Sequence, residues 1–392
     1  MNAIPESVGF PRMMKETGEK RVFLPEFIQG LAQHGLRIYL EEGYGSHLGY
    51  TFADYHQGND AIDSCAREQV FQQDLILVLR SPRLEEYAMV KKGAILFSML
   101  HFPTRPKRVG KLQELGIRAI SMDSVANDND IRLIENMHAV AWNGLEAAFD
   151  VLERKFTGLM REKPFNVLIL GSGMVGKHAV DSATKLGNIE RNNQHIHSGG
   201  PGSLALTIGR NLSKNANVLQ QLFQNADVLV DATQRRDASQ VVVPNEWLGW
   251  LPEHAVIVDL AVDPYTLDID PPVLRGVEGI PQGNLDKYVF APDDPDWDAS
   301  VPASIPSSNR RTVVSCYSWP GIHPEACMRH YAQQMEPLLD VLLEKGYDSL
   351  SLGGGYFERA LYRATLQGWQ KTGHHSKDYR REYMESGKDK NP

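Results

Sequence analysis

The sequence predicts an α/β fold built on parallel sheets, and three observations support this. A short apolar run from Val167 to Leu170 breaks at a glycine-rich turn and resumes as a helix-like segment. Strand-like and helix-like segments also alternate through the first 135 residues, which is typical of a parallel sheet. The chain has 392 residues, more than a single hydrophobic core usually organises, so we expect two domains.

The elements of the first part follow from their apolar patterns. A helix is expected after Pro25, where apolar residues up to Gly35 recur at helical spacing. Four apolar runs are expected to be strands: Leu36–Glu41, Asp74–Arg80, Gly93–Leu100 and Arg118–Met122. The second of them is ended by Ser81 and Pro82.

The second part begins with apolar residues at helical spacing from Glu135 to Phe156, long enough to bridge two lobes. Further strands are expected at Ala226–Thr233 and Ala255–Asp263, the second of them ending at Asp263. A second long helix over Glu325–Leu343 is expected to return the chain to the first lobe.

Two segments are expected to lack regular structure. Asn188–Ser203 is polar and glycine-rich, which predicts an insertion loop with His195 and His197 solvated rather than bound to a metal. The stretch from Lys371 onward is polar and rich in charge, which predicts a mobile tail.

Composition excludes several classes of function. The net charge is −8 with no stripe of lysine or arginine, which argues against nucleic acid as a partner. No apolar run reaches the roughly 18 residues of a membrane span, and no secretory signal is visible at the N-terminus. The cysteines, Cys65, Cys316 and Cys327, lack the spacing of metal ligands, so we expect a cytoplasmic protein without a metal site.

The glycine-rich turn has the spacing of a dinucleotide-binding motif, and its strand–turn–helix context makes that interpretation specific. Gly171 would allow the tight turn, Gly173 would let a diphosphate approach the backbone, and Gly176 would let helix and strand pack closely. The expected cofactor-binding residues of this turn are Gly171, Ser172, Gly173, Met174, Val175 and Gly176.

The residues after the next strand bear on which cofactor is bound. In such folds this strand usually ends in an acid that binds the ribose hydroxyls of NAD. The candidate strand begins at Leu204, and Arg210, Asn211 and Ser213 follow it in place of an acid. This pattern suits a 2′-phosphate and favours NADP, with NAD left as the alternative.

Several segments, in this order, resemble the alanine dehydrogenase family. That family includes the nicotinamide-binding subunit of proton-translocating transhydrogenase, the lysine-forming saccharopine dehydrogenases and carboxyethylornithine synthase. The resemblance extends over most of residues 8–345. The segments that carry it are Val8–Pro11 with Glu19–Val22, Asp74–Pro82, Gly93–His101, Glu135–Met137, the glycine turn, Val258–Asp263 and Trp319–Pro324.

The resemblance implies two Rossmann-like lobes joined by long helices, with the active site in the cleft between them. Residues 1–135 and 325–370 would form the substrate domain, residues 136–324 the dinucleotide-binding domain, and residues 371–392 the tail. It also implies a homo-oligomer.

The resemblance also assigns site residues. Arg21 matches the arginine that binds the substrate carboxylate, and His101 matches the catalytic histidine, whose imidazole exchanges protons near neutral pH. Asp263 matches an aspartate that faces substrate and nicotinamide, and Met137 matches the bend where the connecting helix passes the nicotinamide.

Arg80 departs from the family pattern, because alanine and saccharopine dehydrogenases have a lysine there. An arginine keeps the charge and can hold a carboxylate, but its pKa above about 12 prevents it from acting as a base. We therefore expect an NAD(P)-dependent oxidoreductase acting on a C–N bond. Oxidative deamination and opine-type reductive condensation remain open, and the alternative is a nucleotide-binding sensor without catalysis.

Overall fold

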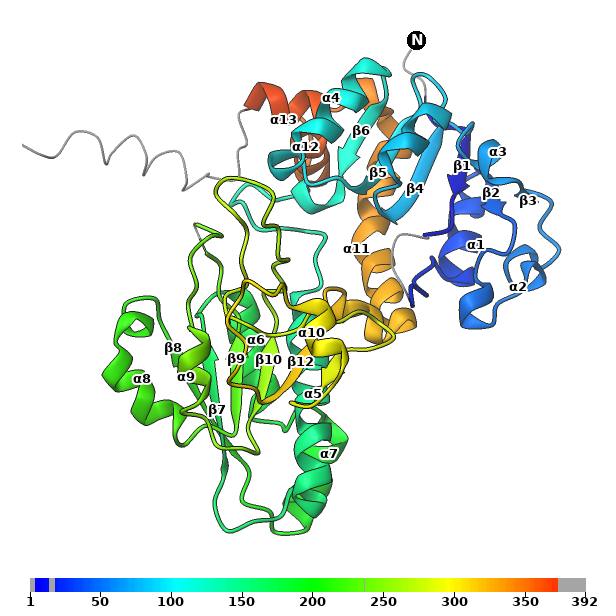
Figure 1. The fold of residues 1–392 in the computed structure, drawn as a ribbon. Helices are drawn as coiled ribbons and strands as arrows, with labels where there is room; N and C mark the ends of the chain where they lie inside the picture. The colour runs from blue at the N-terminus through cyan, green and yellow to red at the C-terminus, as the bar shows by residue number, and fades with distance from the viewer. Residues whose placement is uncertain (1–3, 14–17, 236, 373–392) are drawn as a thin grey trace, which may run out of the picture. The chain divides into compact units, whose positions relative to one another are not determined.

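A computed structural model of the protein describes residues 4–13, 18–235 and 237–372, without the side chains of Thr104 and Ser213. The described chain forms two compact units (Figure 1). Unit 1 combines the residues up to Asn136 with those from His323 onward, and unit 2 is Met137–Ile322. The chain therefore leaves unit 1 once and returns to it once.

Unit 1 contains a six-stranded sheet in the order β3-β2-β1-β4-β5-β6, and every neighbouring pair is parallel. This is the strand order of the Rossmann fold. Its strands are β1 (Ser7–Phe10), β2 (Arg37–Glu41), β3 (Ile62–Cys65), β4 (Leu75–Arg80), β5 (Ile95–Met99) and β6 (Arg118–Ser121).

Alternate residues of each strand face opposite sides of this sheet, because successive side chains of a strand point to opposite faces. In β4, Leu75, Leu77 and Leu79 join a core formed with α1 and α11, whereas Ile76 and Val78 join a core formed with α4. The helices of unit 1 are α1 (Pro25–Gln33), α2 (Phe52–His56), α3 (Arg67–Val70), α4 (Pro106–Glu114), α11 (Pro324–Lys345), α12 (Tyr356–Ala364) and α13 (Leu366–Thr372).

Unit 2 contains a second six-stranded sheet, in the order β11-β12-β10-β9-β7-β8, in which only the β11–β12 pair is antiparallel. Its strands are β7 (Phe165–Leu170), β8 (Ser203–Ile208), β9 (Val228–Asp231), β10 (Val256–Asp259), β11 (Val289–Phe290) and β12 (Thr312–Ser315). Both sheets thus have the mixed α/β, Rossmann-like architecture that the sequence predicts.

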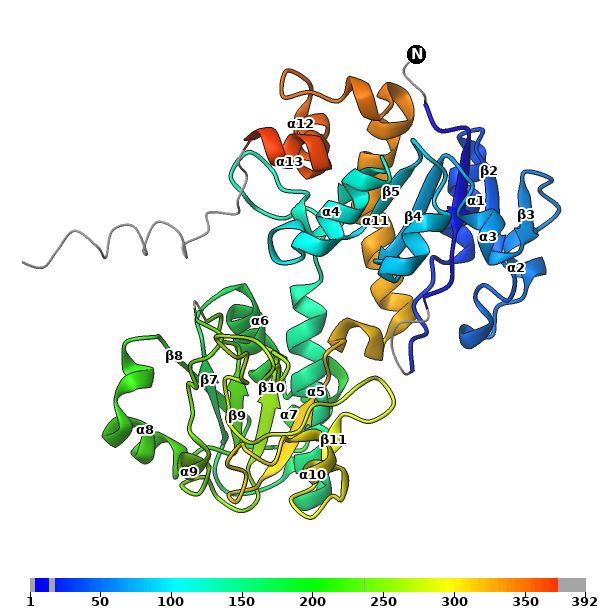
Figure 2. The ribbon, with the colours of Figure 1, turned by 45° about the horizontal axis from the view of Figure 1, so that its top comes forward.

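Two cores also cover the faces of this second sheet. Val167 and Ile169 of β7 pack with α5 and α6, and Leu168 and Leu170 pack with α8 on the other face. The helices of unit 2 are α5 (Met137–Lys155), α6 (Met174–Ala183), α7 (Ile189–His197), α8 (Ala216–Phe223), α9 (Asn245–Leu248) and α10 (Asp296–Ser300). Figure 2 shows α5 running beside β10, as their close packing requires.

The two long helices each begin where the chain crosses between units. The first, α5, lies within unit 2 over its whole length, and the second, α11, lies within unit 1. Each helix therefore stabilises one unit, and the crossings occur just before Met137 and just before His323.

The prediction of an insertion loop at residues 188–203 is wrong, because helix α7 occupies most of it. The Asn188 side chain caps this helix by accepting hydrogen bonds from the backbone N–H groups of Glu190 and Arg191. His195 is also buried rather than solvated, and its Nε2 accepts from the Gly202 N–H at 2.9 Å. The polar composition had concealed a capped amphipathic helix.

Two boundaries also differ from the sequence predictions. Strand β10 ends at Asp259, so Asp263 does not end a strand but lies four residues beyond it, in a loop fixed by a hydrogen bond from the Val262 N–H to Asp259. The helix α13 includes Lys371, where the tail was expected to begin, and residues 373–392 of that tail lie outside the described residues. Within the described residues, no helix combines the length and the apolar character needed to cross a membrane.

Candidate functional site

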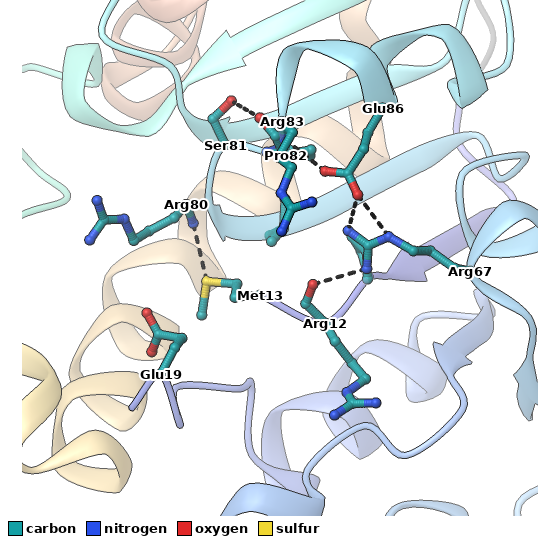
Figure 3. Close-up of a pocket in the computed structure, with 11 residues that line it drawn as sticks. Arg12, Met13, Glu19, Arg67, Arg80, Ser81, Pro82, Arg83 and Glu86 are labelled. Atoms are coloured by element: carbon teal, nitrogen blue, oxygen red, sulfur yellow. Dashed lines mark hydrogen bonds and ion pairs between the residues drawn. The ribbon is translucent and has the colours of Figure 1, made fainter. Parts of the chain in front are cut away.

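In the sheet of unit 1 the strand order reverses at β1, whose neighbours are β2 on one side and β4 on the other. In open α/β sheets, ligands bind outside the carboxyl ends of the strands at such a switch point. A pocket of about 240 Å³ lies there. Its walls are the segments that follow β1 and β4, together with side chains from α3 and neighbouring loops (Figure 3): Pro11, Arg12, Met13, Glu19, Arg67, Val78, Arg80, Ser81, Pro82, Arg83 and Glu86.

Arg80 is the last residue of β4 and one of the residues that line this pocket. Its backbone N–H donates to the Met13 sulfur at 3.4 Å, which ties the end of β4 to the segment after β1. On the opposite side of the pocket, the Arg67 guanidinium contacts Glu41 at 2.5 Å and Glu86 at 2.6 Å and so fixes that wall. The residue that departs from the family pattern thus lies in a pocket with fixed walls.

Arg21 is buried and forms a two-point ion pair with Glu19. Its Nε donates to Glu19 Oε1 at 2.8 Å, and its Nη2 donates to Oε2 at 2.5 Å. Burial alone would lower the pKa of Arg21, but the hydrogen bond and charge of Glu19 outweigh it, so the pKa is raised. A substrate carboxylate at Arg21 would therefore have to share the guanidinium with Glu19.

The structure places Arg21 and Arg80 near the same tyrosine. Tyr331, on α11, is buried; burial raises the pKa of its hydroxyl, and the charges of Arg21 and Arg80 oppose that rise. Glu19 also lines both the Arg80 pocket and a smaller one beside Arg21. The two arginines expected to bind substrate thus share a neighbourhood within unit 1.

His101 lies two residues beyond β5 and is paired with Asp123, which follows β6. Its Nδ1 is 3.2 Å from Asp123 Oδ2, and its backbone N–H donates to Oδ1 at 3.0 Å. His101 has φ of 51°, a left-handed conformation unusual for a side-chain-bearing residue. The imidazole is half exposed, whereas the aspartate side chain is only 10% exposed.

Asp123 was not foreseen from the sequence. Burial alone would raise the pKa of its carboxyl, but hydrogen bonds and the charge of His101, together with a hydrogen bond from Ser121, lower it to about 2. The carboxylate therefore stays ionised and orients the His101 ring through Nδ1. Such a pair directs proton exchange with a ligand to Nε2.

Neighbouring strands bring this pair to the same edge of the sheet as Arg80. Met99 of β5 pairs with Arg80 of β4, and Ser98 of β5 pairs with Ser121 of β6. Arg80, His101 and Asp123 consequently lie at or just beyond the carboxyl ends of three adjacent strands. His101 does not line the Arg80 pocket itself.

Unit 2 has its own switch point at β7, whose neighbours are β8 and β9. The glycine turn lies there, between β7 and α6. A Cβ on Gly171, whose φ is 109°, would lie 2.4 Å from the Ala232 carbonyl oxygen, and one on Gly176 would lie 2.1 Å from the Gly171 oxygen. Neither position accepts a side chain.

Gly173 differs from these two glycines, because nothing lies within 4 Å of the position its Cβ would take. It is the N-cap of α6, and Ser172, Gly173 and Met174 are exposed, whereas Val175 is half-buried. The turn therefore presents bare backbone and the N-terminus of a ten-residue helix to solvent, which fits an anionic diphosphate.

Arg210 and Asn211 follow β8, as expected from the sequence, and the Ser213 side chain lies outside the described residues. The Arg210 Nη2 donates to the carbonyl of Gln234, which follows β9, at 3.2 Å. Because β7 lies between β8 and β9, this contact crosses the end of the strand that leads into the glycine turn.

Asp263 is held by Arg235, whose Nη2 lies 2.7 Å from its carboxylate. Arg235 also donates to three carbonyls, those of Ala238, Gln240 and Leu274, and so fixes the loops beyond β9 and β10. Met137, the remaining sequence-predicted contact, is the first residue of α5 and is half-buried.

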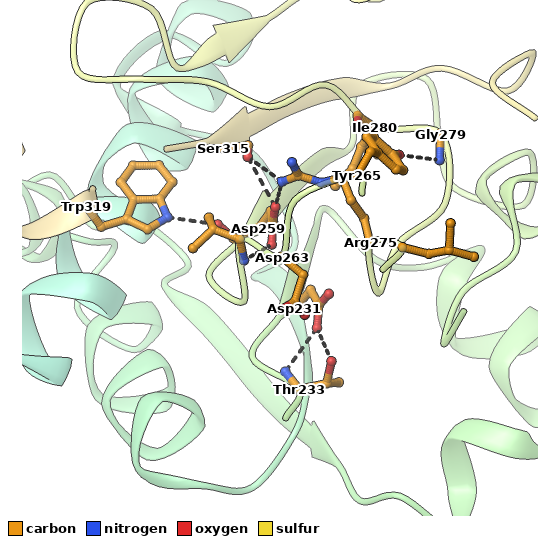
Figure 4. Close-up of polar contacts among 12 residues, drawn as sticks. Asp231, Thr233, Asp259, Asp263, Tyr265, Arg275, Gly279, Ile280, Ser315 and Trp319 are labelled. Atoms are coloured by element: carbon orange, nitrogen blue, oxygen red, sulfur yellow. Dashed lines mark hydrogen bonds and ion pairs between the residues drawn. The ribbon is translucent and has the colours of Figure 1, made fainter. Parts of the chain in front are cut away.

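A buried ion pair lies beneath these loops (Figure 4). Arg275, 1% exposed, contacts Asp259 at the end of β10 and donates to Ser315 of β12 at 2.8 Å. Burial lowers the pKa of Arg275 and raises that of Asp231, whose carboxylate accepts from the Thr233 N–H and hydroxyl. Arg275 thus joins the carboxyl ends of β10 and β12. In the described part of the chain, no three side chains gather as metal ligands.

Comparison with known proteins agrees with this architecture. Residues 10–141 match the family model "Alanine dehydrogenase/PNT, N-terminal domain", and residues 145–264 match "Alanine dehydrogenase/PNT, C-terminal domain". The chain is 25% identical to the alanine dehydrogenase of Bacillus subtilis over 273 residues, which is 65% of this chain and 70% of that protein. It is 24% identical to the alanine dehydrogenase of Methanococcus maripaludis over 273 residues, 65% of this chain and 72% of that one.

Two further proteins either share a lower sequence identity with this chain or match a shorter part of it. The chain is 25% identical to the NAD(P) transhydrogenase subunit alpha of Haemophilus influenzae, over 47% of this chain and 37% of that subunit. A solved L-alanine dehydrogenase has the same fold, with a TM-score of 0.67, 21% identity and coverage of 92% of this chain and 94% of that one. The two family models follow each other along the chain in the order of the two sheets. The chain therefore belongs to the alanine dehydrogenase/PNT family.

Proposed function

We propose that this protein is a nicotinamide-dependent amino-acid dehydrogenase acting on a C–N bond. The observation that carries the proposal is the His101–Asp123 pair, which lies on the strand ends next to Arg80 in a chain of this family. The guanidinium of Arg80 would hold the carboxylate of an amino or oxo acid. Because Asp123 orients the ring through Nδ1, His101 would exchange a proton with the substrate nitrogen or carbonyl oxygen through Nε2.

The residues of unit 2 fit a dinucleotide. Gly173 leaves room above the N-terminus of α6 for the diphosphate, and Gly171 and Gly176 keep the turn tight against β7 and β9. When bound, the nicotinamide would supply or accept the hydride of the reaction. Met137 and Asp263 are proposed to contact the ring and substrate, with Arg235 setting the direction of the Asp263 carboxylate.

We further propose NADP as the preferred cofactor. No acid occurs from Gly209 to Asn215, and the first charged side chain after β8 is Arg210. Its contact with Gln234 keeps the guanidinium at the strand ends that flank the glycine turn, where a 2′-phosphate would be bound. Replacing Arg210 with glutamine should lower kcat/KM for NADPH by about tenfold and change that for NADH much less. Lys214→Gln, in the same loop, serves as the control.

The activity is tested by following NADPH and NADH oxidation with pyruvate, glyoxylate or 2-oxoglutarate, each with ammonium and then with amino acids. Ammonium-dependent turnover would indicate deamination chemistry, and amino-acid-dependent turnover would indicate reductive condensation. His101→Gln should lower kcat by about 10²- to 10⁴-fold while NADPH binding persists. His34→Gln is the matched control, because His34 also faces an aspartate, Asp340, but on the surface.

A second candidate function follows from Arg80. An arginine remains protonated and cannot take a proton from the substrate, so the protein could bind nucleotide and acid without turnover. NADPH binding with no oxidation in any substrate combination would favour this sensor function. The family resemblance also leads us to propose a homo-oligomer, whose size light scattering would measure.

A further inference from the structure

The pocket at the switch point of unit 1 contains more positive charge than one substrate carboxylate requires. Four arginines line it: Arg12, Arg67, Arg80 and Arg83. Among the described residues, the acids that line it are Glu19 and Glu86. In the view of Figure 3, Arg83 extends from the segment after β4 into the space between Arg80 and Arg67.

The acids near this pocket already have partners. Glu19 is paired with Arg21, and it also accepts the Arg21 backbone N–H at 2.9 Å. Glu86 accepts two hydrogen bonds from Arg67 and a third from the backbone N–H of Arg83. Glu41, behind the wall, is shared by Arg67 and the backbone N–H of Arg12. These three carboxylates therefore fix the walls, and none of them pairs with the guanidinium of Arg12 or Arg83.

Two guanidinium groups are not used in these ion pairs. Among the residues that the structure describes, no acidic side chain pairs with the guanidinium of Arg12 or Arg83. Arg12 instead makes contacts of 3.4 Å with the Glu42 carbonyl and the His47 ring. The guanidiniums of Arg12 and Arg83, which line the pocket together with Arg80, can therefore bind a further anionic group. A guanidinium binds a carboxylate most strongly when both its hydrogen bonds are made.

We infer that this pocket binds the second carboxylate of a substrate that carries two, with Arg83 and Arg12 as the residues that select it. This inference rests on the proposed function for the role of Arg80, which takes the first carboxylate. Arg80 and Arg83 lie on one short segment interrupted by Pro82, so the two carboxylates would be separated by only a few carbon atoms. A volume of about 240 Å³ suits a molecule of that size.

The second carboxylate has two chemical sources. It is either the distal group of a dicarboxylic oxo acid or the carboxylate of an amino acid that serves as nitrogen donor. Both place an anion a few atoms from the reacting carbon, and both would be recognised by the same guanidinium groups. The turnover experiment below separates them.

Binding is tested first, without turnover, by calorimetry with the unreactive acids glutarate and butyrate. Glutarate should bind at least tenfold more tightly than butyrate, because it adds a charge-assisted contact. Arg83→Gln should weaken glutarate binding by about 10- to 100-fold and so remove most of that selectivity. Arg37→Gln is the control, because Arg37 lies at the amino end of β2 in an exposed pair with Asp63. Equal affinity for the two acids, or glutarate binding unaffected by Arg83→Gln, would overturn the inference.

Turnover then compares pyruvate with ammonium, 2-oxoglutarate with ammonium, and pyruvate with alanine. A preference for the second combination identifies the distal group of the oxo acid, and a preference for the third identifies the donor carboxylate. Either preference should fall in Arg83→Gln through a higher KM, with a smaller change in kcat. The highest kcat/KM for pyruvate with ammonium would count against the subsite. Arg83-dependent glutarate binding without any turnover would instead refute the proposed function and leave the subsite standing.

Discussion

The two sheets have related strand orders, yet the carboxyl edges at their switch points are built in different ways. In unit 1 the edge consists of charged side chains around a pocket, with Arg67 joining Glu41 and Glu86. In unit 2 the turn after β7 is bare backbone, and the ion pair of Asp259 and Arg275 is buried at the ends of β10 and β12. The comparison teaches that the fold determines where a ligand binds, and that the residues at the strand ends determine which kind of ligand fits there.

The largest expected effect concerns the buried pair of unit 2. Replacing Arg275 with methionine leaves Asp259 buried without its cation, which should lower the free energy of unfolding by about 3–5 kcal/mol. Replacing the half-buried Arg67 of unit 1 with methionine should lower the free energy of unfolding by less. Glu86 is partly open to water, and Glu41 keeps the backbone N–H of Arg12 as a donor. Urea unfolding followed by tryptophan fluorescence measures both changes. Equal losses would show that the two edges are stabilised alike.

A second variant removes the buried charge altogether. Asp259→Asn combined with Arg275→Met should recover part of the stability lost by Arg275→Met alone, because no unpaired ion then remains in the core. A double variant less stable than the single one would show that the Asp259 carboxylate serves another contact, such as the one with Ser315.

The next prediction compares alanine substitutions at two glycines of the same turn, Gly176 and Gly173. Gly176→Ala should destabilise unit 2 by about 1–3 kcal/mol, because its Cβ would overlap the Gly171 carbonyl. Gly173→Ala has room in the protein and should leave the free energy of unfolding within about 0.5 kcal/mol. It should nonetheless weaken NADPH binding, measured by nucleotide fluorescence, because the methyl group occupies the space proposed for the diphosphate. Unchanged NADPH affinity in Gly173→Ala would refute that placement.

The His101–Asp123 pair of unit 1 should make stability depend on pH. The pKa of Asp123 is lowered from 3.8 to about 2 in the folded protein, so its stabilisation is complete above about pH 4 and is lost as the pH falls toward 2. Asp123→Asn should therefore cost about 2 kcal/mol at pH 6, and this difference from the wild type should shrink toward pH 2. Unfolding measured in urea across this range tests the sign, which a constant difference would contradict.

The smallest effect is expected at the opposite end of the unit 1 sheet. Arg37 and Asp63 form an exposed pair at 3.1 Å, and Arg37→Gln should change the free energy of unfolding by less than about 1 kcal/mol. A larger loss of stability would mean that ion pairs stabilise the unit 1 sheet at both ends, and not chiefly at its carboxyl edge.

The sequence predicted the strands and helices well where an element is long or buried on both sides, as with β4, β5, α5 and α11. It also located the glycine turn, because three glycines at this spacing between a strand and a helix are typical of a dinucleotide-binding turn. Helix α7 was missed, although Asn188 followed by Glu190 is a helix-start signal that the polar composition obscured.

The side-chain pairs of the site were harder to foresee. Asp123 is 22 residues from His101 in the chain, and only the register of β5 against β6 makes them neighbours. Arg12 and Arg83 are still further apart, in segments after β1 and β4 whose adjacency depends on the strand order. Local patterns do not encode such contacts, because they arise when separate strands align.

The division of the chain between the units has a consequence for its synthesis. Unit 2 is one continuous segment and is complete once Ile322 has been made, so it can fold while the rest is still being translated. The core of unit 1, in contrast, includes Met328, Leu338 and Leu361 from the returning segment. The sheet with the arginine pocket therefore lacks one of its covering layers until this returning segment has been made. A nascent chain paused before α11 would expose its apolar face to chaperones.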